Sequence, residues 1–369
     1  MRTSKWVQFG PAVSDLAVAE PARKIIDKPA SKPKRTLKLV WIPAIADEAV
    51  GYGKISAYLP RYVNAAGAES VGYRAYDWDW RIAIGGPRAY LMGRGTHVIE
   101  DFVYHTMFEA RPIPPDYLGV LNRSRAIWVP SAWVRDLFIE GGVTQPIFVS
   151  GYGVNRDFFH AKYNLRTGDE PYTFLWCGTA LGDGENIGDR KGGELVWQAF
   201  RKLNLPDSRL ILKAGQSSAI RRIVGDDRIM LSTGNLPEAD YAMLLASADC
   251  FVYPSRGEGF GLQPLEAMAI GLPVIAPAYS GMADFVKSDT AIVLPVQGEV
   301  HAHLYSNIYN LECAWAELSL DDVCDRMRWA YDHREEAKAI GCRAAAWVAK
   351  RWTWQEAGKR AYKALLAIK

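Results

Sequence analysis

A chain of 369 residues exceeds what one hydrophobic core usually spans, so two domains are expected. Hydrophobic residues make up 49% and charged residues 23% of the chain, which is ordinary for a soluble globular protein. The net charge is only +3, but residues 1–36 alone carry +5, which leaves −2 for the rest.

The cysteines and the hydropathy pattern exclude several classes of protein. Five cysteines, odd in number and without a CxxC pair, indicate neither a disulfide framework nor a zinc site, and they fit a reducing cytosol. No stretch reaches the ~18 uninterrupted apolar residues of a membrane span, and no apolar signal-peptide core follows the first charges. We therefore expect a cytoplasmic protein without a transmembrane segment.

Residues 1–36 form a basic tail rich in proline and alanine, which ends in KPASKPKRT. This composition predicts an extended, flexible segment. One interpretation is a solvated tether. The other is contact with a polyanionic acceptor, either DNA or an anionic membrane surface, because clustered basic side chains bind phosphates with release of counterions.

Residues 37–160 predict a first α/β domain. LKLVWIPA indicates a buried strand, GYG a glycine turn and KISAYLPRYVNAAG a helix. Further strands are expected in ESVGYRAY, HVIEDFVYH, RAIWVP and PIFVSGYG, and helices in PDYLGVLNRS and SAWVRDLFIEGG. Such alternation is typical of a parallel sheet. Trp78 and Trp80, which have polar neighbours, are candidates to line a cleft.

Residues 170–345 repeat this alternation after a polar linker. YTFLWCG, RLILKAG and RIMLSTG predict strands, and LVWQAFRKLN and EADYAMLLASA predict helices. Beyond residue 310 the pattern is helical, and residues 346–369 predict a final amphipathic helix. The fold class is therefore α/β, with two similar halves.

The most informative segment, SRGEGFGLQPLEAMAIGLPVIAP, covers residues 255–277 and reads as the end of a strand, a glycine loop and a helix. Gly259 and Gly261 allow the backbone to approach a ligand closely. The amides of Phe260, Gly261 and Leu262 are expected to point out of the helix start, where the peptide dipoles favour a phosphate.

Two carboxylates, Glu258 and Glu266, stand on either side of this loop. They are eight residues apart, which corresponds to about 12 Å along a helix. A pyrophosphate fits between them, with one carboxylate accepting hydrogen bonds from a ribose and the other from a hexose. The pattern therefore predicts a sugar-nucleotide site.

The string EGFGLQPLEAMAIGLPVIA resembles the donor-binding signature of the retaining family 4 glycosyltransferases, which have the GT-B fold of two facing Rossmann-like domains. The resemblance implies that Glu266 binds the nucleotide ribose and Glu258 the donor sugar near its reacting carbon. It also implies that the last helix crosses back to the first domain. A nucleotide diphosphate sugar would be the donor substrate, with no other cofactor and no metal.

The family also has a basic residue and a lysine at the donor pyrophosphate. Lys191 in DRKGGELV matches the lysine, but Thr179 stands where relatives have the basic residue. Either Arg190 replaces that residue or the GDGEN insertion folds over the donor. Both alternatives stay open.

In the first domain, the resemblance implies that His105 contacts the donor sugar, with Glu109 as a supporting residue. Gly51 and Gly53 occupy the place of a glycine-rich loop that faces the donor phosphates.

The resulting hypothesis is a retaining glycosyltransferase acting on the hydroxyl of a saccharide, a lipid-linked acceptor or a small molecule. A DNA glycosyltransferase of the phage type, acting on hydroxymethylated bases, is an alternative within the fold, as are a sugar-nucleotide epimerase and a phosphorylase. An alternative of another class is a non-catalytic module that binds sugar nucleotides or nucleic acid. The combination of Glu258, Lys191 and Glu266 argues against such a module, because binding alone does not need all three.

Overall fold

The computed structural model describes residues 36–43, 51–72, 74–86, 101–161, 170–181, 189–217, 226–302 and 311–368. Most of the basic tail and the GDGENIG insertion lie outside these residues. The chain separates into residues 1–32 and residues 33–369, and all the helices and strands given below belong to the second unit.

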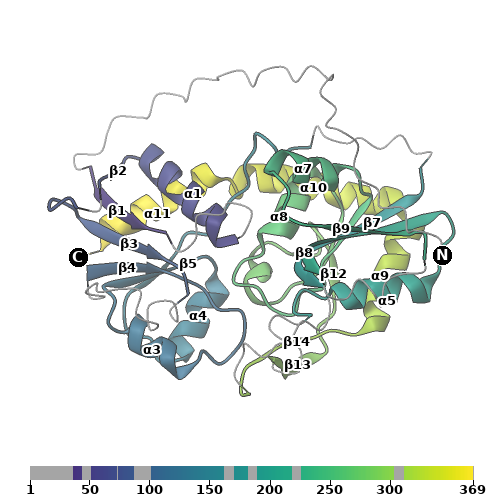
Figure 1. The fold of residues 1–369 in the computed structure, drawn as a ribbon, viewed down its shortest axis with the longest axis horizontal. Coiled ribbons are helices and arrows are strands. Elements are labelled where there is room, and N and C mark those ends of the chain that lie inside the picture. Colours follow the sequence, from purple (N-terminus) through teal and green to yellow (C-terminus); the bar gives the residue numbers. More distant parts are fainter. Residues whose placement is uncertain are drawn as a thin grey trace. The chain divides into compact units, whose positions relative to one another are not determined.

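The first sheet has six parallel strands in the order β2-β1-β3-β4-β5-β6 (Figure 1). The strands are β1 (Lys38–Ile42), β2 (Glu69–Ser70), β3 (Trp80–Ile84), β4 (Phe102–His105), β5 (Ala126–Val129) and β6 (Ile147–Val149). The expected parallel sheet is thus confirmed. The strand expected in ESVGYRAY is confined to two residues. Strand β3 was not expected, because Arg81 interrupts its apolar pattern.

Within the described ranges three helices accompany this sheet: α1 (Gly51–Ala65), α3 (Pro115–Leu121) and α4 (Ala132–Glu140). Helix α4 begins at Ser131, whose hydroxyl accepts a hydrogen bond from the amide of Val134 at 3.2 Å, as an N-cap does. Gly51 and Gly53 lie in the first turn of α1 and not in a turn before it, so the assignment of GYG to a loop was wrong.

The second sheet also has six parallel strands, in the order β12-β11-β10-β7-β8-β9. The strands are β7 (Tyr172–Leu181), β8 (Ser208–Ser217), β9 (Ile229–Thr233), β10 (Cys250–Val252), β11 (Val274–Pro277) and β12 (Ile292–Leu294). The strands expected from YTFLWCG, RLILKAG and RIMLSTG are all present.

Helices surround this sheet, and a short antiparallel hairpin follows it. These elements are α5 (Gly193–Leu203), α7 (Glu238–Ala246), α8 (Leu262–Ile270), the 3-10 helix η2 (Ser280–Asp284), β13 (Gly298–His301), β14 (Ala314–Glu317), α9 (Leu320–Asp332) and α10 (Arg334–Arg351). We call residues 36–161 the first half and residues 170–351 the second half. None of the helices in the described ranges combines the length and the apolar character needed to cross a membrane.

The two halves share one hydrophobic core. Its buried side chains continue from Leu59 and Trp128 in the first half, through Tyr152, to Phe260 and Leu265 in the second. Because this core passes beside the start of α8, it holds the glycine loop against the first half.

The last helix, α11 (Trp354–Ala367), returns to the first half and packs along α1 (Figure 1). Thr353 begins the helix by accepting a hydrogen bond from the amide of Glu356 at 3.2 Å. A Cβ on Gly358 would lie 2.4 Å from the carbonyl oxygen of Tyr62, so only glycine allows this approach. The predicted return of the last helix is confirmed.

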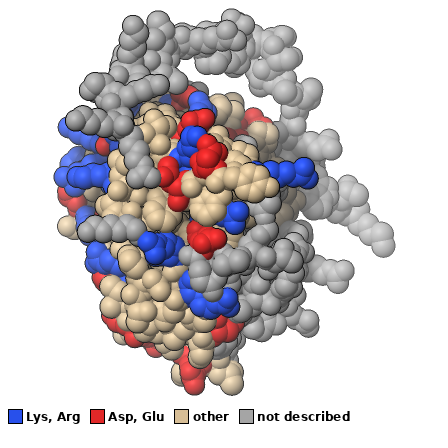
Figure 2. Space-filling view, turned by 90° about the vertical axis from the view of Figure 1, so that its left-hand side faces the viewer, with Lys and Arg blue, Asp and Glu red and all other residues tan. Residues whose placement is uncertain are grey.

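Figure 2 shows one face of the molecule, on which basic and acidic side chains of the described residues are intermixed. No patch of one sign dominates the described part of that face.

Candidate active site

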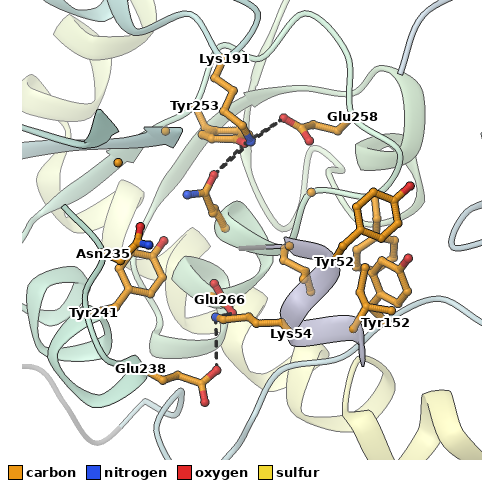
Figure 3. Close-up of a pocket in the computed structure, with 18 of the residues that line it drawn as sticks. Tyr52, Lys54, Tyr152, Lys191, Asn235, Glu238, Tyr241, Tyr253, Glu258 and Glu266 are labelled. Carbon is orange, nitrogen blue, oxygen red and sulfur yellow. Dashed lines mark hydrogen bonds and ion pairs between the residues drawn. The ribbon is translucent and has the colours of Figure 1, made fainter. Parts of the chain in front are cut away.

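A cavity of about 660 Å³ lies at the carboxyl ends of strands from both sheets, which is where open parallel sheets bind ligands (Figure 3). The first half contributes Gly51, Tyr52, Lys54, Ile55, Tyr58, Met107, Glu109 and Tyr152. The second half contributes Gly178, Arg190, Lys191, Lys213, Gly215, Asn235, Leu236, Pro237, Glu238, Tyr241, Tyr253, Glu258, Phe260, Gly261, Leu262, Gln263 and Glu266.

The glycine loop forms one wall of the cavity at the start of α8. Gly261 precedes the helix with a φ of 98°, a left-handed conformation that favours glycine. Because Gly261 has no side chain to cap the helix, a phosphate is a suitable acceptor for the amides of the first turn. Phe260 and Leu262 line the cavity as expected.

Gly259 is not among the residues that line the cavity. Its carbonyl accepts a hydrogen bond from Ser131 of the first half at 2.8 Å. A Cβ at this position would lie 2.5 Å from the sulfur of Met107. Gly259 therefore allows the two halves to approach each other, and a contact with the ligand stays a prediction.

Glu258 is 7% exposed and lies in a network of donors. Its Oε1 accepts hydrogen bonds from Ser255 at 2.8 Å and Tyr253 at 2.9 Å, and it lies 3.1 Å from both Nη1 of Arg190 and Nζ of Lys191. Burial opposes ionisation of Glu258, but the two cations and the hydrogen bonds hold its pKa at about 2. Glu258 is therefore a carboxylate at neutral pH.

The two basic residues predicted for the pyrophosphate lie beside Glu258 in the same cavity. Lys191 also donates to Gln263 at 3.2 Å, and Arg190 donates to the carbonyl of Gly257. Burial lowers the pKa of Lys191, with a further contribution from Arg190, while Glu258 opposes the shift. The side chain of Thr179 lies outside the described residues, as does the insertion after it.

Glu266 lies deeper in the cavity and is 3% exposed. Its Oε1 accepts a hydrogen bond from Nζ of Lys54 at 2.5 Å, and the same ammonium lies 3.2 Å from Glu238 (Figure 3). Sequence reasoning missed Lys54 and Glu238. One signal was available for Lys54, because a cation near the N-terminus of a helix opposes the helix dipole and calls for a specific partner.

His105 lies at the end of β4, as expected, but its side chain is fully buried and is not among the cavity residues. Its Nε2 lies 2.8 Å from the hydroxyl of Tyr152, and its ring meets that of Trp128 edge-on at 4.8 Å. Tyr152 itself lines the cavity. His105 can thus affect a ligand through Tyr152, and a direct contact with the donor sugar stays a prediction.

The remaining candidates divide between the cavity and the protein interior. Gly51 and Glu109 line the cavity, whereas Gly53 is buried and does not. Trp78 and Trp80 are not among the residues of this cavity. They lie just before and at the start of β3, under the guanidinium groups of Arg81 and Arg125, and a role in lining a cleft stays a prediction. Lys213 on β8 also lines the cavity, and sequence reasoning missed it because it lies inside an apolar strand.

Comparison with known proteins finds similarity within the second half. Residues 180–311 match the model for Glycosyl transferases group 1. The chain is 40% identical over 142 residues to a GDP-mannose-dependent alpha-mannosyltransferase of Mycolicibacterium smegmatis, covering 36% of this chain and 35% of that protein. It is 30% identical over 183 residues to the GDP-mannose-dependent monoacylated alpha-(1-6)-phosphatidylinositol monomannoside mannosyltransferase of Corynebacterium glutamicum, covering 46% and 42%. The chain spans half or less of the length of these relatives.

Solved structures agree over most of the chain. Sucrose-phosphate synthase from Thermosynechococcus elongatus superposes with a TM-score of 0.64, and HepE from Anabaena, in complex with UDP and glucose, with a TM-score of 0.63. Each match covers 90% of this chain and 100% of the other at 14% identity, so these structures show the fold. The chain therefore has the GT-B fold, and its residues 180–311 are similar to the group 1 glycosyltransferases.

Proposed function

We propose that the protein transfers a sugar from a nucleoside diphosphate sugar to an acceptor hydroxyl. The observation that carries this proposal is the arrangement of Glu258 and Glu266 in one cavity, on either side of an uncapped helix start and with Arg190 and Lys191 beside Glu258. The helix start and the two cations suit a pyrophosphate, and Glu266 suits the ribose hydroxyls.

The charges of this cluster suit the departure of a nucleoside diphosphate. Negative charge grows on the leaving phosphate as the glycosidic bond breaks, and Arg190, Lys191 and the α8 amides can stabilise it there. These groups support our proposal that no metal is required, since they supply the positive charge that a metal otherwise brings.

Glu258 suits a role near the reacting carbon other than that of an acid or a nucleophile. With a pKa of about 2 it holds no proton to donate at neutral pH. A carboxylate of such low basicity that already accepts from Ser255 and Lys191 is a weak nucleophile. These properties support transfer with retention by a front-face route, in which the leaving phosphate removes the proton of the acceptor and Glu258 accepts hydrogen bonds from the donor sugar.

The donor is to be sought among two nucleotide classes. Two of the curated relatives are named for GDP-mannose, and HepE was solved with UDP-glucose. For the acceptor, residues 1–36 carry +5 whereas the rest of the chain carries −2, so the tail is the segment that we expect to contact a polyanionic acceptor. The five free cysteines support a cytoplasmic location.

The test is a panel of nucleotide sugars that includes GDP-mannose and UDP-glucose. We expect at least one to raise the melting temperature of the protein, because a ligand that binds only the folded state stabilises it. The same compound should release nucleoside diphosphate during turnover, and the Glu258→Gln variant should bind it but release little. Stabilisation without turnover in the presence of candidate acceptors would favour a non-catalytic binding module. No stabilisation by any member of the panel would refute the proposal.

A further inference from the structure

Lys54 joins the two halves of the molecule inside the cavity. It belongs to α1 of the first half, whereas its two carboxylate partners belong to helices of the second half, Glu266 to α8 and Glu238 to α7. The ammonium lies 2.5 Å from Oε1 of Glu266 and 3.2 Å from Oε1 of Glu238 (Figure 3).

The surroundings of this ammonium fix its position. The side chain of Lys54 is only 15% exposed, and its Nζ lies 5.3 Å from the ring centroid of Phe159 and 5.7 Å from that of Tyr241. Both distances are within the range of cation–π attraction. A lysine held by two carboxylates and two aromatic rings has a defined position, unlike the lysine of a flexible surface ion pair.

Glu238 is in turn held from the first half. Its Oε2 accepts a hydrogen bond from the hydroxyl of Tyr58 at 2.5 Å and from Nδ2 of Asn155 at 3.1 Å. Asn155 also donates to Tyr58 at 2.8 Å. Both oxygens of Glu238 therefore have partners, whereas the bond that Glu266 makes to Lys54 among the described residues uses Oε1.

The three charged groups together carry a net charge of −1 in a buried place. Without Lys54, two carboxylates would be left close together, and their repulsion and burial would both disfavour the ionised form of Glu266. An ionised carboxylate accepts hydrogen bonds on both oxygens, but a protonated one loses part of that capacity. Lys54 therefore favours the ionised form of Glu266, which can accept from a ligand while Oε1 is bound to the ammonium.

Resting on the proposed function, we propose that Lys54 is a positioning residue for the donor ribose. Its ammonium holds Oε1 of Glu266 from the opposite half, and Oε2 is presented to a ribose hydroxyl. Recognition of the ribose then depends on both halves of the molecule, because Glu266 contacts the ribose from the second half and Lys54 positions Glu266 from the first.

The experiment compares the binding of UDP and GDP with that of their 2′-deoxy and 3′-deoxy analogues by calorimetry. We expect the wild-type protein to bind one deoxy analogue about tenfold or more weakly, because a hydrogen bond to a charged acceptor is lost. Lys54→Met should weaken binding of the ribonucleotide about tenfold. The ratio of the affinity for the ribonucleotide to the affinity for the deoxy analogue should then be close to one. Lys54→Arg, which keeps the charge, should retain at least part of that ratio.

Two further variants make the result specific. Arg61→Met removes a basic side chain from the exposed face of the same helix and should leave affinity and ratio unchanged. If Lys54→Met does not fold, the double variant with Glu238→Gln keeps the net charge of the cluster at −1 and removes the repulsion between the carboxylates. It should still lose the preference for the ribonucleotide, because no ammonium then fixes Oε1 of Glu266.

The outcomes separate the two proposals. A wild-type protein that binds neither UDP nor GDP overturns the proposed function and this inference with it. If the wild type binds nucleotide but Lys54→Met keeps the wild-type affinity and ratio, or binds more tightly, only the role of Lys54 is wrong. A lower melting temperature with an unchanged ratio would show that Lys54 is merely structural.

Discussion

The imidazole of His105 should stay neutral over the whole pH range in which exposed histidines titrate. Burial lowers its pKa to about 3, against about 6.5 for an exposed imidazole. At pH 5 about 1% of His105 would be protonated in the folded state, against about 97% of an exposed histidine. Because the folded pKa is depressed, the stability that neutral His105 contributes is present above pH 6.5 and is lost as the pH falls towards 3. By linkage, the loss is about 2 kcal/mol at pH 5 and about 5 kcal/mol below pH 3.

The assay is NMR of protein labelled selectively at histidine. The chain has six histidines, and the signals of His105 are assigned as those missing from the His105→Gln variant. Glutamine can still form a hydrogen bond with Tyr152, so the fold should be kept. We expect the His105 signals to keep their neutral positions from pH 8 to pH 5. Urea unfolding at pH 7 and pH 5 should show a smaller loss of stability for the variant than for the wild type.

A shift of the His105 signals with a midpoint near pH 6.5 would refute this reasoning. It would mean that the imidazole reaches solvent in a populated conformation, and a direct contact with the donor sugar would then become the better interpretation. An equal pH dependence of stability for wild type and His105→Gln would contradict the energetic part of the prediction.

Three other predictions follow from the site and the tail. Glu266→Ala should weaken the binding of nucleotide measured by calorimetry, whereas Glu258→Gln should leave that affinity nearly intact and lower turnover about 10²-fold; equal, small effects would contradict these roles. Lys191→Ala should lower turnover by about 10²-fold, or roughly 3 kcal/mol, through loss of charge at the leaving group, and wild-type turnover would exclude Lys191 from that role. Binding to duplex DNA or anionic vesicles should fall steeply with salt and lose that dependence when residues 1–36 are deleted; absence of binding at low salt would favour a neutral acceptor.

The glycine-loop part of the site could be predicted from the sequence because its determinants are contiguous. Strand, glycine loop and helix follow one another within residues 250–277, so local propensity and spacing are enough to bring Glu258, Gly261 and Leu262 to the same wall. Lys191 could be added because the resembling family has a lysine at the corresponding place, just before the helix that is α5 in the structure.

The ion pair of Lys54 and Glu266 could not be predicted in this way. The two residues are 212 positions apart, and only the packing of the two halves brings them together. The environment of His105 has the same origin: its place at the end of a strand is a local property, but its burial depends on Trp128 and Tyr152 from other segments. Strand β3 was missed for a local reason, since Arg81 lies at a partly exposed position inside it.

Helix α11 has a consequence for the order in which the molecule folds. It buries Trp354, Ala361 and Leu365, and its glycine face lies against α1. During synthesis α1 leaves the ribosome early, and α11 leaves it after every other described helix. The apolar surface of α1 that α11 covers is therefore exposed to solvent while the second half is made. The first half therefore completes its packing last, although it is made first. A chain that stops at residue 351 would release a fully made second half joined to a first half that still exposes this surface, which makes aggregation its expected fate.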